Sequence, residues 1–333
     1  MKVVEIPQYG IEHLRVAERA TPEPGSGQVL VRLKAASLNY RDLATVLGGF
    51  GAAYKLPLVP LSDACGEIAA VGAGVTRVKV GDRVATMFFQ GWLSGEPTMA
   101  GLGTALGGSL DGVWRDFALL SEQGVSKVPA YMSDAEAATL SCAGLTAWRS
   151  LIVEGGLKAG ETVLVLGAAG GVGTAAIQIA KAVGAKVIAA TSTDAKCELC
   201  AQLGADATIN YSTTNLRDQL KALTAGKGPD VVYDPVGGRF TEPSLRSIAW
   251  RGRLLVVEIR GAHEPQHRPE ALGAVEPRAR LHADARRIVF DSLRHSHPAP
   301  PDVEVPEGVL RCRLAARINH TAQQAKAPVL QLH

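Results

Sequence analysis

The hydrophobic and polar positions change their period part of the way along the chain. Up to about Leu120, apolar residues alternate with polar ones in short runs that end at Gly or Pro, as at residues 28–33. This pattern predicts a β-rich barrel or sandwich. From about Ser133 onward, apolar runs of strand length alternate with helical patterns, which predicts βαβ units and a parallel sheet.

Individual elements follow from the same pattern. Strands are expected at 28–33, 66–72, 78–84, 162–166, 186–190, 231–233 and 253–257, and helices at 171–183 and 195–203. The chain is therefore expected to be an α/β protein with a β-rich domain at 1–125 and a doubly wound parallel sheet at 126–257.

The C-terminal segment, 258–333, has an anomalous composition. It holds seven of the eight histidines and ten arginines but a single lysine, and it shows no sustained strand period. Two interpretations stay open. The segment is either divergent and loop-rich, or it is a stretch of a GC-rich gene read in an altered frame.

Composition and charge exclude several classes of protein. The net charge of +3 and the 5% aromatic content give no support for a nucleic-acid partner. No run of 18 apolar residues predicts a membrane span, and the N-terminus has no leader pattern. Five scattered cysteines do not form a disulfide framework, which indicates a cytoplasmic protein with reduced thiols. Cys197 with Cys200, and His295 with His297, lack the further ligands that a metal site needs.

A glycine turn follows the strand at 162–166. The turn reads Gly167-Ala168-Ala169-Gly170-Gly171-Val172-Gly173 and leads into a helix, which is the context of a dinucleotide-binding site. Gly170 and Gly171 let the backbone approach a pyrophosphate, and Gly173 lets the helix pack on the strand. The free N–H groups of Val172 and its neighbours at the helix N-terminus would face the phosphates.

The end of the next strand selects the cofactor. An NAD site usually places an acidic residue there, whereas this chain has small neutral residues up to Ser192. Asp194 is interpreted as the N-cap of the following helix. Lys196 lies in the first helical turn, where a cation does not suit the helix dipole, and a 2′-phosphate beside Ser192 and Lys196 would explain it. The alternative is a solvated lysine. We predict NADPH.

An ordered set of motifs then resembles a known family. The stretches 37–42, 66–84, 143–148, 167–173, 204–206, 209–211 and 234–238 are together similar to the zinc-independent, quinone oxidoreductase-like branch of the medium-chain dehydrogenase/reductases. The resemblance covers 1 to about 257. It implies a GroES-like barrel followed by a Rossmann domain, with the chain end returning to complete the first domain.

The resemblance also assigns residues to the cofactor. It implies that Ser192, Lys196 and Tyr211 surround the adenosine 2′-phosphate. Thr146 would lie on the nicotinamide side, with Gly237 and Gly238 in the loop above it, and Asn39 near the nicotinamide ribose.

Zinc is not expected in either of the places where zinc-dependent relatives hold it. Asn39 stands at the first ligand position, Leu61-Ser62-Asp63 replaces the Gly-His-Glu motif, and Cys142 alone remains near the third. One thiol cannot supply the three protein ligands of a catalytic zinc. The stretch 88–114, where the structural zinc lobe would lie, has no cysteine.

Without a Lewis acid, hydride transfer to a quinone or to an α,β-unsaturated carbonyl is easier than alcohol oxidation, because the acceptor delocalises the charge. Asn39 and Tyr40 are the candidate donors to the developing oxyanion, and Tyr40 is equally explained as a packing residue. Asp42 is expected to support the loop through Arg41 or a backbone N–H. Two other functions stay open: a non-catalytic NADPH-binding protein and a metal-free alcohol dehydrogenase.

Two departures weaken the resemblance. Related enoyl reductases have a tyrosine where this chain has Phe50, which cannot donate a proton, and Tyr54 would have to substitute. After residue 257 the family's small residues beside the nicotinamide are replaced by Glu258-Ile259-Arg260. The family's homodimer contact involves the same sheet edge, so dimerisation stays open.

Overall fold

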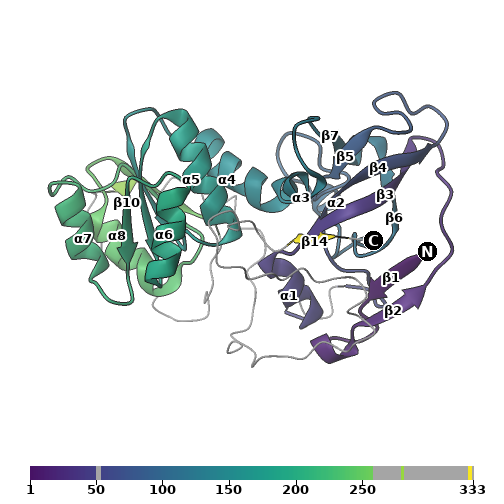
Figure 1. The fold of residues 1–333 in the computed structure, drawn as a ribbon, viewed down its shortest axis with the longest axis horizontal. Helices are drawn as coiled ribbons and strands as arrows, with labels where there is room; N and C mark the ends of the chain where they lie inside the picture. The colour runs from purple at the N-terminus through teal and green to yellow at the C-terminus, as the bar shows by residue number, and fades with distance from the viewer. Residues whose placement is uncertain (50–53, 258–278, 281–328, 332–333) are drawn as a thin grey trace. The chain divides into compact units, whose positions relative to one another are not determined.

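The structure is a computed structural model that describes residues 1–49, 54–257, 279–280 and 329–331. These residues form two compact units that divide between Cys142 and Ala143. Figure 1 shows the β-rich first unit in purple and blue and the α/β second unit in teal and green.

The first unit is a set of short, mostly antiparallel strands around β3 (Gln28–Ser37). β3 pairs with β4 along most of its length, with β6 at one end and with β14 at the other. A separate antiparallel pair joins β1 to β2. The other strands of the unit are β1 (Lys2–Glu5), β2 (Arg15–Glu18), β4 (Asp63–Val71), β5 (Arg83–Thr86), β6 (Phe117–Ser121), β7 (Val125–Lys127) and β14 (Val329–Gln331).

Alternation along β3 explains its central place. Val29, Val31 and Leu33 are buried in the core of this unit, whereas Arg32 is exposed. The strand predicted at 78–84 is wrong in its first part. Gly81 adopts φ +89° in a turn, so only β5, from Arg83 onward, pairs with β4.

Few helices accompany these strands. They are α1 (Tyr40–Val46), α2 (Met99–Leu102), α3 (Asp134–Ala137), the 3₁₀ turns η1 (Ile11–His13) and η3 (Glu122–Gly124), and the π-helical turn η4 (Leu140–Gly144).

The second unit holds a parallel sheet in the order β10-β9-β8-β11-β12-β13. The predicted doubly wound parallel sheet is confirmed. Its strands are β8 (Thr162–Leu166), β9 (Lys186–Thr191), β10 (Ala207–Asn210), β11 (Val231–Asp234), β12 (Gly252–Val256) and β13 (Ala279–Arg280).

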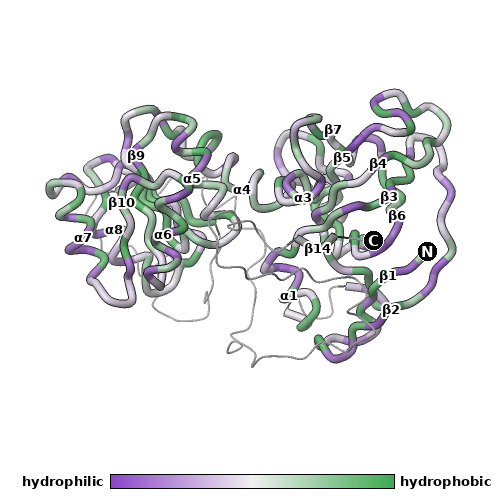
Figure 2. The backbone as a smooth tube through the Cα atoms, viewed as in Figure 1, coloured by the Kyte–Doolittle hydropathy of each residue, from purple (hydrophilic) through white to green (hydrophobic). Residues whose placement is uncertain are grey.

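Helices cover both faces of this sheet, as Figure 1 shows. Val163 and Val165 face a core shared with α5, whereas Leu164 and Leu166 face a core shared with α7 and α8. In Figure 2 the central strands carry the hydrophobic colour and α7 is largely hydrophilic. The helices are α4 (Leu145–Trp148), the π-helical turn η5 (Arg149–Glu154), α5 (Gly171–Val183), α6 (Asp194–Gln202), α7 (Leu216–Leu223), the 3₁₀ turn η6 (Gly238–Phe240) and α8 (Thr241–Ser247).

Most of the anomalous segment 258–333, including His295 and His297, lies outside the described residues. The described parts of it are strand backbone. β13 pairs in parallel with β12, and β14 pairs antiparallel with residues 35–37 of β3. No helix in the described part of the chain has the length and apolar character needed to cross a bilayer.

Candidate functional site

In the second unit, successive strands are added to the sheet in opposite directions on the two sides of the boundary between β8 and β11. β8 is followed by β9 and β10 on one side, and β11 by β12 and β13 on the other. In sheets of this kind, ligands bind outside the carboxyl ends of the strands at such a point. The predicted glycines follow β8 and β11, so they lie at this edge.

The glycine turn leaves the N-terminus of α5 without a side-chain cap. Gly170 is the N-cap, with φ −79° and ψ 170°, and the helix begins at Gly171. Val172 is half-buried against the core. Because α5 has 13 residues, the first-turn N–H groups and the helix dipole form a site suited to an anion.

Gly173 is the glycine on which the packing depends. A Cβ at this position would lie 2.6 Å from the carbonyl oxygen of Ala168, which is backbone and cannot rotate away. The first turn of α5 therefore packs directly on the chain that leaves β8. This confirms the role expected for Gly173 in helix-to-strand packing.

The glycine turn contacts the loops beside it. The N–H of Ala168 donates to the carbonyl of Ala190 in β9 at 3.1 Å. On the other side, a Cβ at Gly167, which has φ +58°, would lie 2.8 Å from Cγ2 of Val236. The turn after β8 therefore contacts the end of β9 and approaches the loop after β11.

The three residues assigned to the 2′-phosphate gather at this edge. The Lys196 Nζ donates to the Ser192 hydroxyl at 3.3 Å, and the Tyr211 N–H donates to the carbonyl of Thr191 at 3.0 Å. The Tyr211 ring packs on Phe240 with 4.6 Å between ring centroids. Lys196 is exposed and forms no ion pair with a residue of the described ranges. An exposed ammonium beside a hydroxyl fits a phosphate group.

The predicted N-cap of α6 is wrong by one residue. Thr193 is the N-cap, and its hydroxyl accepts from the N–H of Lys196 at 3.3 Å. Asp194 is the first residue of the helix, and its carboxylate instead accepts from Nδ2 of Asn210 at 2.7 Å. Thr and Asp are both good caps, so the local sequence could not separate them.

Asp234, the last residue of β11, shapes the loop that carries Gly237 and Gly238. One carboxylate oxygen accepts from the N–H groups of Val236 (2.9 Å) and Gly237 (2.7 Å). Burial raises the pKa of Asp234, against the lowering effect of these donors. Gly237 and Gly238 have φ +66° and +60°, conformations that favour glycine. Thr146, by contrast, lies in α4, half-buried and outside the contacts described above.

In the first unit, the two candidate oxyanion donors lie at the start of α1. Asn39 is the N-cap, and its N–H donates to Oδ2 of Asp42 at 2.7 Å. Arg41 Nη1 lies 3.6 Å from Oδ1 of the same carboxyl. The supporting role expected for Asp42 is confirmed. Tyr40 is 48% exposed.

A buried carboxyl, Asp63, contacts Ser62, Cys142 and Asn39, the three residues that the resemblance aligns with the zinc ligands of relatives. It accepts from the Ser62 hydroxyl at 2.7 Å and from the Cys142 N–H at 2.8 Å, and the Asn39 amide lies beside it. Burial raises the pKa of Asp63 to about 6 and that of Asp42 to about 7, although Arg41 opposes both shifts. Within the described ranges, no three His, Cys, Asp or Glu side chains gather closely enough to hold a metal ion.

The importance of Asp63 was not recognised from the sequence. The resemblance accounts for the triplet Leu61-Ser62-Asp63 only as the remains of a metal motif. The sequence carries a signal, because Ser62 and Asp63 interrupt a stretch that is otherwise apolar from residue 58 to residue 65. Charged residues in such places usually have a partner or a function.

Arg41 and Tyr54 approach the same backbone position. The Arg41 Nη2 and the Tyr54 hydroxyl would lie 3.0 and 3.2 Å from a Cβ at Gly108. Arg41 also stacks over Phe88 at 4.8 Å and donates to the carbonyl of Leu106 at 3.1 Å. Phe50 lies outside the described residues.

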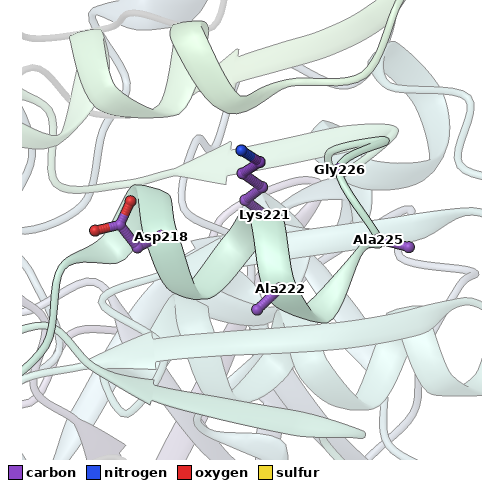
Figure 3. A pocket seen from close by; sticks show the side chains of 5 residues that line it. All are labelled: Asp218, Lys221, Ala222, Ala225 and Gly226. Atoms are coloured by element: carbon purple, nitrogen blue, oxygen red, sulfur yellow. The ribbon is translucent and has the colours of Figure 1, made fainter.

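A surface hollow elsewhere in the second unit does not belong to this site. Figure 3 shows it on α7 and the following turn, where the charged groups of Asp218 and Lys221 point apart. None of the predicted site residues lines it. It is lined by Asp218, Lys221, Ala222, Ala225 and Gly226.

Comparison with known proteins identifies the family. The zinc-binding dehydrogenase profile matches residues 171–287, and the alcohol dehydrogenase GroES-like domain profile matches residues 25–130. The chain is 41% identical over 253 residues to a zinc-type alcohol dehydrogenase-like protein of Schizosaccharomyces pombe, covering 74% of this chain and 72% of that protein.

Solved structures agree with this assignment. A crystal structure of an NAD-dependent alcohol dehydrogenase aligns with a TM-score of 0.73 at 34% identity, covering 82% of this chain and 81% of that one. Escherichia coli quinone oxidoreductase complexed with NADPH aligns at 0.67 and 30% identity, covering 79% and 74%. The predicted GroES-like and Rossmann domains are confirmed. The chain belongs to the medium-chain dehydrogenase/reductases and is a quinone oxidoreductase-like oxidoreductase of that family.

Proposed function

We propose that this oxidoreductase transfers a hydride from NADPH to a quinone or to an alkene conjugated with a carbonyl, without zinc. The observation that carries the proposal is the cluster around Asp63. The cluster joins Asn39, Ser62 and Cys142, which the resemblance aligns with the zinc ligands of relatives and of which only the thiol is a good zinc ligand. A site of this composition suits an acceptor that delocalises its own developing charge.

The residues at the sheet edge fit NADPH. Bound NADPH would supply the hydride. The uncapped N-terminus of α5, from Gly170 to Gly173, would bind the pyrophosphate, and Ser192, Lys196 and Tyr211 would surround the 2′-phosphate. Thr146, Gly237 and Gly238 are proposed to lie toward the nicotinamide.

The proton and oxyanion chemistry is assigned to the first unit. We propose Asn39 and Tyr40 as the donors to the acceptor oxygen. Tyr54 is a third candidate, because its hydroxyl approaches Gly108, as the Arg41 guanidinium also does. A hydroquinone oxygen would need no protein donor, since water can protonate it.

Replacing Lys196 by alanine tests the choice of cofactor. Loss of the ammonium should weaken NADPH binding about tenfold, because a charge-assisted contact at an exposed site is lost, and should leave NADH within about twofold. Fluorescence titration with both cofactors measures this. Lys186→Ala, an exposed lysine at the opposite end of β9, is the matched control. Equal losses for NADPH and NADH would contradict the assignment.

The function itself is tested by the loss of NADPH absorbance with a panel of quinones and enones, with NADH in parallel. Turnover that depends on both NADPH and the acceptor is the expected result. Binding of NADPH without turnover would favour a cofactor-binding protein. Because alcohol dehydrogenases occur among the relatives, alcohols with NADP⁺ complete the panel. Turnover only with alcohols would replace the reductase proposal.

A further inference from the structure

Asn210 connects two parts of the proposed 2′-phosphate site. It is the last residue of β10, and its Nδ2 donates to Oδ1 of Asp194 in the first turn of α6 at 2.7 Å. Its Oδ1 accepts from the Ser212 N–H at 3.1 Å, and its carbonyl accepts from the Thr214 N–H at 3.0 Å. The same side chain therefore fixes the turn that carries Tyr211 and orients the Asp194 carboxylate.

The two charged side chains in the first turn of α6 have different partners. Asp194 extends to Asn210 on β10, whereas Lys196 extends to Ser192 at the end of β9. Residues two apart on a helix do not face each other, so this separation agrees with the helical geometry. Within the described ranges, neither side chain forms an ion pair.

The position of the Asp194 carboxylate matters for a dianionic ligand. A phosphate monoester carries a charge of about −1.5 to −2 at neutral pH, so a mobile carboxylate nearby would repel it. The Asn210 amide holds this carboxylate without introducing a charge of its own. An aspartate or lysine in its place would change the potential around Lys196.

We propose that Asn210 is a specificity-determining residue for the cofactor: by holding the Asp194 carboxylate on the β10 side, it leaves Lys196 as the charge that acts on the 2′-phosphate. This inference rests on the proposed use of NADPH and adds a residue that acts through Asp194. Asn210 is therefore a positioning residue rather than a contact to the phosphate.

A double-mutant cycle tests the proposal. Isothermal titration calorimetry measures the affinity of each variant for two probes, adenosine 2′,5′-bisphosphate and adenosine 5′-monophosphate. Asn210→Ala should weaken the bisphosphate about three- to fivefold, the size of one exposed charge interaction, and should change the monophosphate little. Adding Asp194→Ala should restore the bisphosphate affinity, because the released carboxylate is then absent. Neither probe requires turnover.

Asn215→Ala is the matched control. Asn215 also accepts backbone hydrogen bonds, as the N-cap of α7, and within the described residues the partners of its side chain are the N–H groups of Arg217 and Asp218 in that helix. It should leave both probes unchanged. Equal weakening of both probes by Asn210→Ala, no weakening at all, or a loss that persists in the double variant would overturn the proposal.

The unaltered chain separates this inference from the proposed function. If it binds the monophosphate as tightly as the bisphosphate, the preference for NADPH fails, and the role of Asn210 fails with it. If the unaltered chain prefers the bisphosphate and the cycle shows no coupling, only the role of Asn210 fails.

Discussion

Gly173→Ala is expected to weaken NADPH binding about 100-fold, equivalent to the loss of roughly two charge-assisted hydrogen bonds. The added Cβ would lie 2.6 to 2.7 Å from the O, C and Cα atoms of Ala168, so the first turn of α5 must move away from β8. Alanine favours a helix by about 1 kcal/mol over glycine, whereas overpacking against backbone costs about 1–3 kcal/mol. Because no flexible side chain can yield here, we expect the clash to dominate, with a lower free energy of unfolding.

Gly170→Ala provides the comparison within the same turn. Its φ of −79° suits alanine, and its Cβ would meet only the Gly167 carbonyl oxygen, at 3.3 Å. This variant should keep the free energy of unfolding within about 1 kcal/mol and lose mainly cofactor affinity. Urea denaturation and NADPH titration of both variants distinguish the two effects. A Gly173→Ala protein with unchanged stability and affinity would contradict the packing argument.

Asp42→Asn is expected to remove much of the pH dependence of stability of the first unit. Burial raises the pKa of Asp42 to about 7 from an ordinary value near 3.8, so the folded state binds a proton that the unfolded state releases. The stability from this proton is full below about pH 4 and is lost as the pH rises through 7. Three pKa units correspond to about 4 kcal/mol as an upper limit, since Asp42 is coupled to Asp63.

The measurement is urea denaturation of the unaltered and variant proteins between pH 4.5 and 8. As the pH rises, the free energy of unfolding of the Asp42→Asn protein should increase relative to that of the unaltered protein. Asp82→Asn is the flat control, because the hydrogen bond with Lys127 lowers the pKa of Asp82 from its ordinary value near 3.8, so its contribution to stability is already complete at pH 4.5 and stays constant up to pH 8. Parallel profiles for Asp42→Asn and the unaltered protein would show that Asp42 does not titrate in this range.

The second unit was the more predictable part of the fold. The predicted strand at 162–166 and helix at 171–183 agree residue for residue with β8 and α5, because each carries its full hydrophobic period and a glycine turn separates them. The first unit was less predictable. Val78 and Val80 continue an apolar alternation, yet the chain turns at Gly81 and the strand starts only at Arg83.

The candidate site likewise has residues that the local sequence pointed to and residues that it did not. The glycine turn, Ser192 and Lys196 lie close together in the chain, and local sequence pointed to them. The roles of Asp63 and Asn210 depend on partners distant in the chain, Cys142 for the first and Asp194 for the second. Spacing in the sequence gives no information on such pairs.

By itself, the sequence determined the α/β class, the family and the succession of β8, α5, β9 and α6 in the second unit, whereas β10, α7 and α8 were not predicted. The features that it determined depend on periodicity and on residue identity, which are local. Only the tertiary structure decided which groups share an environment. Burial raises the pKa of Asp42 and of Asp63 despite the nearby Arg41 guanidinium, and packing against Ala168 leaves no room for a Cβ at Gly173. Desolvation and close contact arise from segments that meet only on folding, so no local pattern specifies them.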